Sequence, residues 1–210
     1  VFIISRVLYY QAGVRFQGDT YLGYWQFIDP LLLKTDLLRS VFYLHSQPPL
    51  LNLFTGIVLQ VFPATHAEVF HILYFITGLI LASALYALGI KLQFSPWLSA
   101  VLSAGFVISP GAVLYEHWLS YTHPLAAMLT LAGVSLYQFQ HTQKNYWGLI
   151  FFSLLAAIVL TWSLFHIVWF YFIVVFVYIL ANSKKKVVIT ALLPMIIVTG
   201  WYAKNLIQVG

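Results

Sequence analysis

The sequence predicts an all-α integral membrane protein, a multi-span helical bundle of about seven spans with interfacial helices in its first external loop. Of the 210 residues, 62% are hydrophobic and only 7% are charged. An ordinary soluble domain carries about 25% charged residues, and a surface as apolar as this one would not stay dispersed in water. Apolar stretches recur along the whole chain, as expected for helices that each need about 20 such residues to cross a bilayer.

Seven apolar stretches are the predicted spans. Residues 1–10 form the end of a first span, and the others are residues 68–90, 95–110, 124–139, 146–165, 166–181 and 187–202. The stretches of residues 146–165 and 166–181 are continuous in sequence. One helix over that length would be roughly 54 Å long, well beyond a hydrocarbon core of about 30 Å. We therefore expect the chain to fold back near Trp162 to His166.

Residues 11–63 are predicted to form the first external loop. Its first part carries too many charged residues to lie in hydrocarbon. Tyr21, Trp25, Ile28 and Leu32 recur at helical spacing and Pro30 breaks the run, which predicts two short helices at the membrane interface. Residues 50–62 are apolar but too few to span, which favours a re-entrant or interfacial helix.

Basic residues in short loops predict the orientation, because such loops stay in the cytoplasm. Lys184–Lys185–Lys186 is the strongest signal, and Lys91 and Lys144 agree with it. The loop of residues 115–123 is then external. So are all five acidic residues, which are Asp19, Asp29, Asp36, Glu68 and Glu116. In the alternative orientation, the helix beginning near Glu68 starts on the cytoplasmic side. The sides assigned to all later loops are then inverted.

The chain is expected to be a fragment of a longer protein, with residues 1–210 in a single transmembrane domain. Val1 already lies inside an apolar run, and no charged segment or cleavage site of a signal peptide follows it. The absence of cysteine excludes disulfides and thiolate chemistry. The formal charge is +5, but the basic residues lie between apolar runs and not on a solvated face, so nucleic-acid binding is not expected.

Two polar segments of the first external loop are candidate site residues. Asp19, in Gly18-Asp19-Thr20-Tyr21, is either a functional carboxylate or the N-cap of an interfacial helix. His45 and Gln47 precede Pro48-Pro49, which fixes an extended backbone at the membrane surface. At that surface the two side chains either contact a phosphate or a sugar hydroxyl, or have no role and only lie next to the start of a helix.

The second external loop carries Glu116, His117 and His123, bracketed by Trp118 and Tyr121. A carboxylate beside imidazoles can hold a divalent metal or assist proton transfer. The alternative is an aromatic belt at the interface.

Three cations are candidates for a lipid-linked phosphate, namely Arg6, Arg39 and Lys204. Snorkelling of these side chains to lipid headgroups explains them equally well. No Walker loop, GxGxxG, HExxH, GxSxG or CxxC motif is present, so nucleotide-driven pumping and those hydrolase chemistries lack support.

The order of these features resembles the GT-C superfamily of membrane glycosyltransferases, in particular the bacterial relatives of protein O-mannosyltransferases and aminoarabinose transferases. The resemblance covers nearly the whole chain and rests on four segments. These are Arg6 with Gly18-Asp19-Thr20-Tyr21, then His45-Ser46-Gln47-Pro48-Pro49-Leu50, then Ile108-Ser109-Pro110 through Thr122-His123-Pro124, and Trp201-Tyr202-Ala203-Lys204-Asn205 with Gly210. Where the family often has Asp-Glu, this chain has Asp19-Thr20, so a second acid must lie elsewhere, with Glu116 as the candidate.

The resemblance implies transfer of a sugar from a polyprenyl-phosphate carrier to a glycan, lipid or protein acceptor, with inversion at the anomeric carbon. Asp19 would be the base, with Glu116 as a second catalytic acid. Arg6, Arg39, His45, Gln47 and Lys204 would bind the donor phosphate, and His117 and His123 would support the acceptor or a divalent metal. The expected location is the bacterial inner membrane, with the site facing the periplasm. A transporter and a non-catalytic membrane scaffold are the competing functions.

Overall fold

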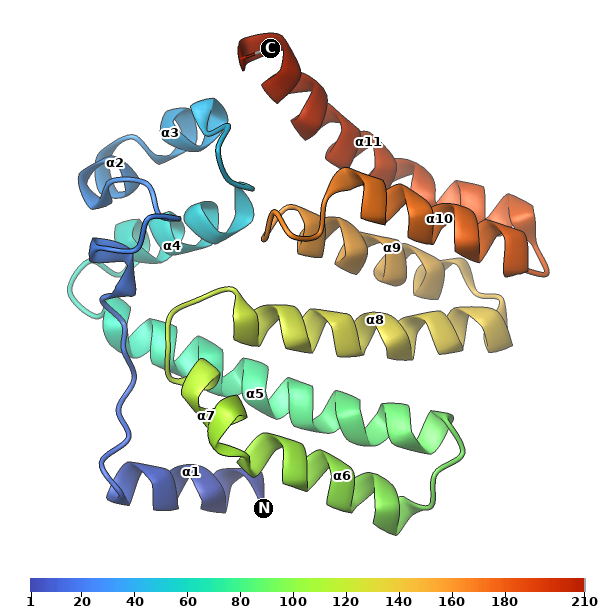
Figure 1. Ribbon diagram of the computed structural model, residues 1–210, viewed down its shortest axis with the longest axis horizontal. Coiled ribbons are helices and arrows are strands. Elements are labelled where there is room, and N and C mark those ends of the chain that lie inside the picture. The colour runs from blue at the N-terminus through green and yellow to red at the C-terminus, as the bar shows by residue number, and fades with distance from the viewer. Residues whose placement is uncertain (210) are drawn as a thin grey trace. The chain divides into compact units, whose positions relative to one another are not determined.

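The computed structural model describes residues 1–209, and their regular secondary structure is entirely helical (Figure 1). This confirms the all-α prediction for the described part of the chain. The chain divides into two compact units. Unit 1 comprises Val1–Tyr43 and Leu51–Ala127, and unit 2 comprises Leu44–Leu50 and Met128–Gly210.

Two helices are long and apolar enough to cross a membrane, namely α5 (His66–Lys91) and α11 (Lys184–Val209). A third span is possible if α6 (Pro96–Ile108) and α7 (Pro110–Glu116) act as one, because together they pass the same test despite a bend of 59° between them. These helices support the assignment to a membrane. Within residues 1–209 the predicted count of about seven spans is therefore not confirmed.

The other predicted spans are short or polar. α1 (Phe2–Gln11), α9 (Asn145–Val159) and α10 (Ile167–Leu180) have 10, 15 and 14 residues. At 1.5 Å per residue, even α9 is only about 22 Å long, less than the ~30 Å hydrocarbon core. α8 (Thr122–Thr142) has 21 residues, but it begins and ends with polar side chains, which lower its hydropathy.

The predicted reversal of the chain in unit 2 is confirmed. α9 ends at Val159 and α10 begins at Ile167, so the turn of residues 160–166 includes the expected region. His166 caps α10, and its Nδ1 accepts a hydrogen bond from the Val168 amide at 3.4 Å. α11 packs against both helices of this hairpin (Figure 1).

The first loop contains the two expected short helices, but not where the sequence placed them. A 3-10 turn, η1 (Thr20–Leu22), is followed by irregular backbone, and α2 (Pro30–Thr35) and α3 (Leu37–Tyr43) both lie after the break expected at Pro30. Pro30 begins a helix instead of interrupting one, because its missing N–H costs nothing at the first helical position. Asp29 completes that start by accepting a hydrogen bond from the Leu31 amide at 2.7 Å.

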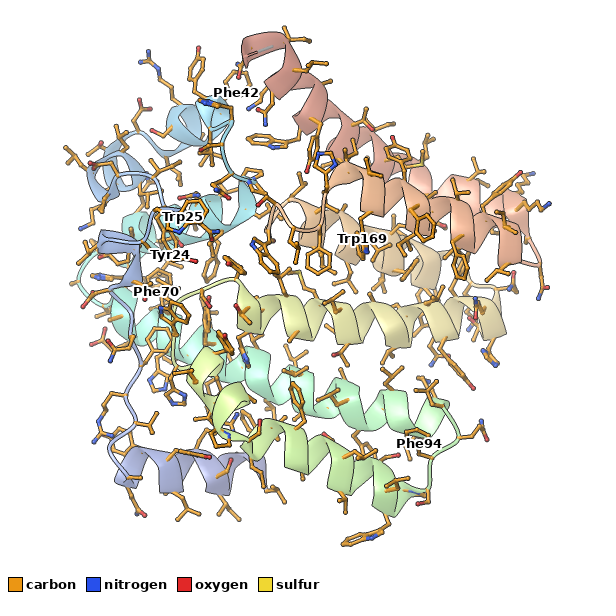
Figure 2. All side chains as sticks on the ribbon, in the orientation of Figure 1. Tyr24, Trp25, Phe42, Phe70, Phe94 and Trp169 are labelled. Carbon is orange, nitrogen blue, oxygen red and sulfur yellow. The ribbon has the colours of Figure 1, made fainter. Side chains whose placement is uncertain are left out.

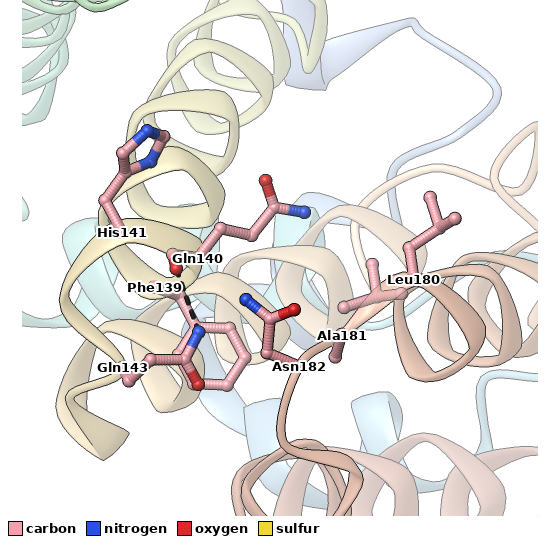
Figure 3. Close-up of a pocket in the computed structure, with 8 residues that line it drawn as sticks. Phe139, Gln140, His141, Gln143, Leu180, Ala181 and Asn182 are labelled. Atoms are coloured by element: carbon pink, nitrogen blue, oxygen red, sulfur yellow. Dashed lines mark hydrogen bonds between the residues drawn. The ribbon is translucent and has the colours of Figure 1, made fainter.

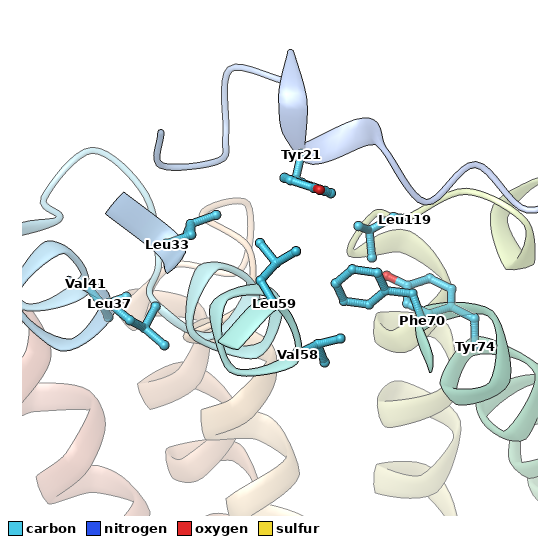
Figure 4. Close-up of a cluster of buried hydrophobic side chains, with 9 residues drawn as sticks. All are labelled: Tyr21, Leu33, Leu37, Val41, Val58, Leu59, Phe70, Tyr74 and Leu119. Atoms are coloured by element: carbon cyan, nitrogen blue, oxygen red, sulfur yellow. The ribbon is translucent and has the colours of Figure 1, made fainter. Parts of the chain in front are cut away.

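α4 (Leu50–Val61) is 12 residues long, or about 18 Å, too short to cross a hydrocarbon core alone. Its apolar face packs in a buried cluster of unit 1 (Figure 4), which consists of Tyr21, Leu33, Leu37, Val41, Val58, Leu59, Phe70, Tyr74 and Leu119. Gly56 permits this packing, because a Cβ there would overlap the Leu37 side chain. The cluster joins the predicted first external loop to α5.

Asn52 fixes α4 to the irregular segment that precedes α2. It is 1% exposed, its Oδ1 accepts a hydrogen bond from the Ile28 amide at 2.7 Å, and its Nδ2 donates to the Gln26 carbonyl at 3.0 Å. One side chain thus satisfies a backbone donor and a backbone acceptor that have no helical partner.

We predict that Asn52→Ala destabilises the protein by about 1–3 kcal/mol, because it leaves buried backbone groups without partners. Unfolding in detergent micelles measures this. Gln60→Ala is the matched control, since Gln60 lies on the same helix but is exposed and forms only 3.2 Å hydrogen bonds. Equal losses in the two variants would contradict the role given to Asn52.

Candidate functional site

The two predicted external loops meet in unit 1 through their backbones. Gln17 and Trp118 form an isolated parallel bridge. The Gln17 amide donates to the His117 carbonyl at 2.7 Å, and the Leu119 amide donates to the Gln17 carbonyl at 3.2 Å. This bridge lies two residues before Asp19 and immediately after Glu116 and His117. It brings together residues that are far apart in the sequence.

Aromatic rings surround the bridge. Tyr24 lies beside Trp25 (Figure 2) and makes an edge contact with Trp118, with ring centroids 6.1 Å apart in each case. A hydrogen bond with Tyr121, followed by burial, raises the pKa of Tyr24 to about 12. Tyr24 therefore stays neutral at physiological pH and links the first loop to the second.

Asp19 presents an exposed carboxylate beside this bridge. It occupies the N-cap position of η1, yet its side chain makes no capping hydrogen bond. The capping role that the sequence left open is therefore not performed by the carboxylate. Burial, and then the negative charge of Asp19, raise the pKa of nearby Tyr21. The Asp19 carboxylate is free to meet a molecule from solution.

Arg6 and Glu116 form a buried ion pair in unit 1. Arg6 Nε donates to Glu116 Oε1 at 2.8 Å, and Nη2 donates to Oε2. Nη1 donates to the Val107 carbonyl at 2.7 Å and to Ser5 Oγ at 2.9 Å. The two side chains are 7% and 2% exposed. Every nitrogen of the guanidinium is thus occupied within the protein.

This pairing changes the interpretation of both residues. Arg6 has no nitrogen left for a donor phosphate, and neither oxygen of Glu116 faces solution. The direct roles expected for them, phosphate binding and acid or base chemistry, are therefore not supported by this geometry. The pair instead holds α1 against the ends of α6 and α7. A Cβ at Gly78 of α5 would overlap the Glu116 carboxylate, so α5 also packs against the pair.

His117 and His123 are buried behind the bridge. His117 is 7% exposed, and its Nδ1 lies 2.9 Å from the Val113 carbonyl. His123 is 3% exposed and its Nε2 has no hydrogen-bond partner. Its ring stacks on Tyr74 at 6.0 Å, and the Tyr74 hydroxyl donates to the Ser120 carbonyl.

Sequence reasoning missed two residues of this cluster, His71 and Tyr74 of α5. His71 lies against Phe16 and His117, with ring centroids 5.3 and 5.7 Å away. The two residues are three positions apart, a spacing that places them on one helix face. That spacing was a usable signal, although nothing in the sequence indicates which loop the face contacts.

The second loop does not fit a divalent metal. Within residues 1–209, no group of three or more His, Asp or Glu side chains is placed to hold a metal ion. Glu116 is paired with Arg6, and His117 Nδ1 is directed at a backbone carbonyl.

The remaining predicted residues are distributed between the units. Arg39 is exposed on α3 of unit 1. In unit 2, Lys204 Nζ lies 3.4 Å from the Leu44 carbonyl and 3.7 Å from the centroid of the Trp201 ring. This contact brings Lys204 to the segment that carries His45 and Gln47.

We predict that Arg6→Met and Glu116→Leu each destabilise the protein by about 3–5 kcal/mol, because each leaves a buried charge unpaired, whereas the Arg6→Met/Glu116→Leu double variant loses much less than the sum. Unfolding in detergent measures the coupling. Arg15→Met is the control, since Arg15 is exposed and donates to the carbonyls of Tyr10 and Val14. Additive losses in the double variant would contradict the pairing.

No protein-family model, curated protein or solved structure matches this chain. Its function must therefore be inferred from its own residues.

Proposed function

We propose that this chain is the membrane-embedded catalytic part of a glycosyltransferase, which moves a sugar from a polyprenyl-phosphate donor to an acceptor hydroxyl. The observation that carries the proposal is the exposed Asp19 carboxylate beside the backbone bridge between the two external loops. The resemblance of the four sequence motifs to GT-C transferases supports the same reaction.

In the proposed reaction Asp19 is the general base. Its carboxylate takes the proton of the acceptor hydroxyl while that oxygen attacks the anomeric carbon on the side opposite the phosphate. The bond from the anomeric carbon to the phosphate oxygen breaks, and its electrons leave with the polyprenyl phosphate. This displacement inverts the anomeric centre. Because Asp19 is exposed, its carboxylate can reach the proton of the acceptor, as a general base must.

Cations on the donor side would stabilise the negative charge that develops on the phosphate. Arg39 is the candidate within unit 1, because it is exposed on α3 of the unit that carries Asp19. Lys204, His45 and Gln47 lie together in unit 2, and their role toward the donor phosphate stays a prediction from the sequence. Arg6 and Glu116 are positioning residues in this proposal. The acceptor is a glycan, a lipid or a protein.

The proposed location is the bacterial inner membrane, with Asp19 on the periplasmic side. Lys186 Nζ donates to the Gln143 carbonyl at 2.7 Å, so the turn before Lys144 and the triple-lysine turn lie at the same end of unit 2. Two basic turns at one end are what the positive-inside rule requires of a cytoplasmic face.

Transport is the second candidate function, because Arg6, Glu116 and His123 are ionisable and buried, as in many solute paths. The two functions differ in the carboxylate they need. Transport requires Glu116 and is indifferent to Asp19, whereas transfer requires Asp19.

We predict that Asp19→Asn lowers sugar transfer from a polyprenyl-phosphate donor by about 10²–10⁴, the usual contribution of a positioned general base. The unfolding midpoint should stay at the wild-type value, because Asn has nearly the same shape and Asp19 is exposed. Asp36→Asn is the matched control, an exposed carboxylate of the same loop. Wild-type turnover in the Asp19 variant would remove this residue from the mechanism.

We also predict that a cysteine at Asp19 reacts with a membrane-impermeant reagent added outside cells, and that one at Lys185 reacts only after permeabilisation. The chain contains no cysteine, so each single variant reports one position. Labelling of Lys185→Cys from outside would contradict the orientation.

A further inference from the structure

Unit 2 contains a cavity of about 480 Å³ between the end of α8 and the end of α10 (Figure 3). Four of its eight lining residues are polar and four are apolar. Gln140, His141, Gln143 and Asn182 form the polar part, while Val177 and Leu180 belong to the apolar part. A cavity lined in this way suits a ligand that has a polar and an apolar end.

Two side-chain amides are available inside this cavity. Figure 3 shows Gln140 from α8 and Asn182 from the turn after α10 directed into the space between them. Neither amide has a hydrogen-bond partner among the side chains and backbone groups of residues 1–208. His141 instead stacks on Tyr137, with ring centroids 3.9 Å apart. The two amides can therefore donate to and accept from a bound headgroup.

The cavity lies in a strongly basic unit. Unit 1 has five basic and five acidic residues by sequence, whereas unit 2 has five lysines and no acidic residue. The formal charge of +5 therefore belongs entirely to unit 2. Four of the five lysines, Lys144 and Lys184 to Lys186, follow closely on the cavity residues Gln143 and Asn182. No carboxylate of unit 2 can neutralise them.

The positions of these lysines favour an anion from outside the chain. Lys184 to Lys186 form the first turn of α11, which carries no acidic residue there. The N-terminal end of a helix carries a partial positive charge. The three lysines are therefore repelled by that charge and by one another. Lys186 Nζ is held on the Gln143 carbonyl at 2.7 Å, and Lys184 Nζ lies 5.5 Å from the Tyr178 ring of α10. A bound anion would relieve this repulsion.

We propose that this cavity binds the headgroup of an anionic phospholipid. Lys184, Lys185 and Lys144 attract its phosphate, and the Gln140 and Asn182 amides hydrogen-bond to its headgroup hydroxyls. Val177 and Leu180 contact the start of an acyl chain, and Leu180 is 58% exposed. Free phosphate shares the anionic chemistry, but the apolar half of the lining favours the lipid. The proposal does not depend on the glycosyltransferase function.

The test is native mass spectrometry of the detergent-solubilised protein titrated with phosphatidylglycerol, with zwitterionic phosphatidylcholine as the comparison lipid. We expect phosphatidylglycerol to bind at least tenfold more tightly. Lys184→Gln/Lys185→Gln should weaken it about 25-fold, since a lysine near an anionic headgroup contributes about fivefold. Gln140→Leu/Asn182→Leu should weaken it about tenfold, because hydrogen bonds to the headgroup are lost.

The control is Lys34→Gln, which removes an exposed lysine of unit 1 and should leave binding unchanged. Unfolding midpoints without lipid establish that each variant is folded, and all the substituted side chains are exposed. Wild-type affinity in the amide variant would overturn the site, because it would reduce the effect to general attraction by lysines. Inorganic phosphate that competes at the same concentration as phosphatidylglycerol would overturn the lipid as its occupant.

Discussion

The ion pair between Arg6 and Glu116 is the interaction on which the meeting of the two predicted external loops in unit 1 depends. Charges removed from water are stable only when their hydrogen-bonding groups are satisfied, and here the guanidinium uses the Val107 carbonyl and Ser5 Oγ as well as both carboxylate oxygens. The pair fixes α1 against α7. Since each of these helices leads directly into one of the predicted external loops, the pair holds together the two chain segments that continue into the backbone bridge of Gln17 with Trp118.

Local features of the fold could be predicted from the sequence, because they follow from lengths and spacings. The reversal between α9 and α10 is required by an apolar run too long for one span. Pro30 shows the limit of the same reasoning, since proline both interrupts and begins helices, and only the Asp29 cap distinguishes the two cases. The number of spans could not be fixed either, because several apolar stretches form helices of 10 to 15 residues.

The candidate site was predictable as a set of residues but not as an arrangement. Glu116 and Arg6 are both ionisable and both near the ends of apolar runs, so the sequence alone assigned them chemical roles. Their mutual pairing joins positions 110 residues apart, and no local pattern encodes such a contact. His71 and Tyr74 were missed for the same reason, because a helix face gains its role only from the loop that packs on it.

Burial separates the two acidic residues to which the sequence analysis assigned catalytic roles. A general base must reach the proton of a substrate and must exchange its own proton afterwards, so its carboxylate needs access to solution. Glu116 is enclosed and paired with Arg6, so it has no such access. Asp19 has the access that Glu116 lacks, and it is placed by the bridge that the Arg6–Glu116 pair supports. In the proposed reaction, the enclosed acid would therefore act by fixing the position of the exposed one.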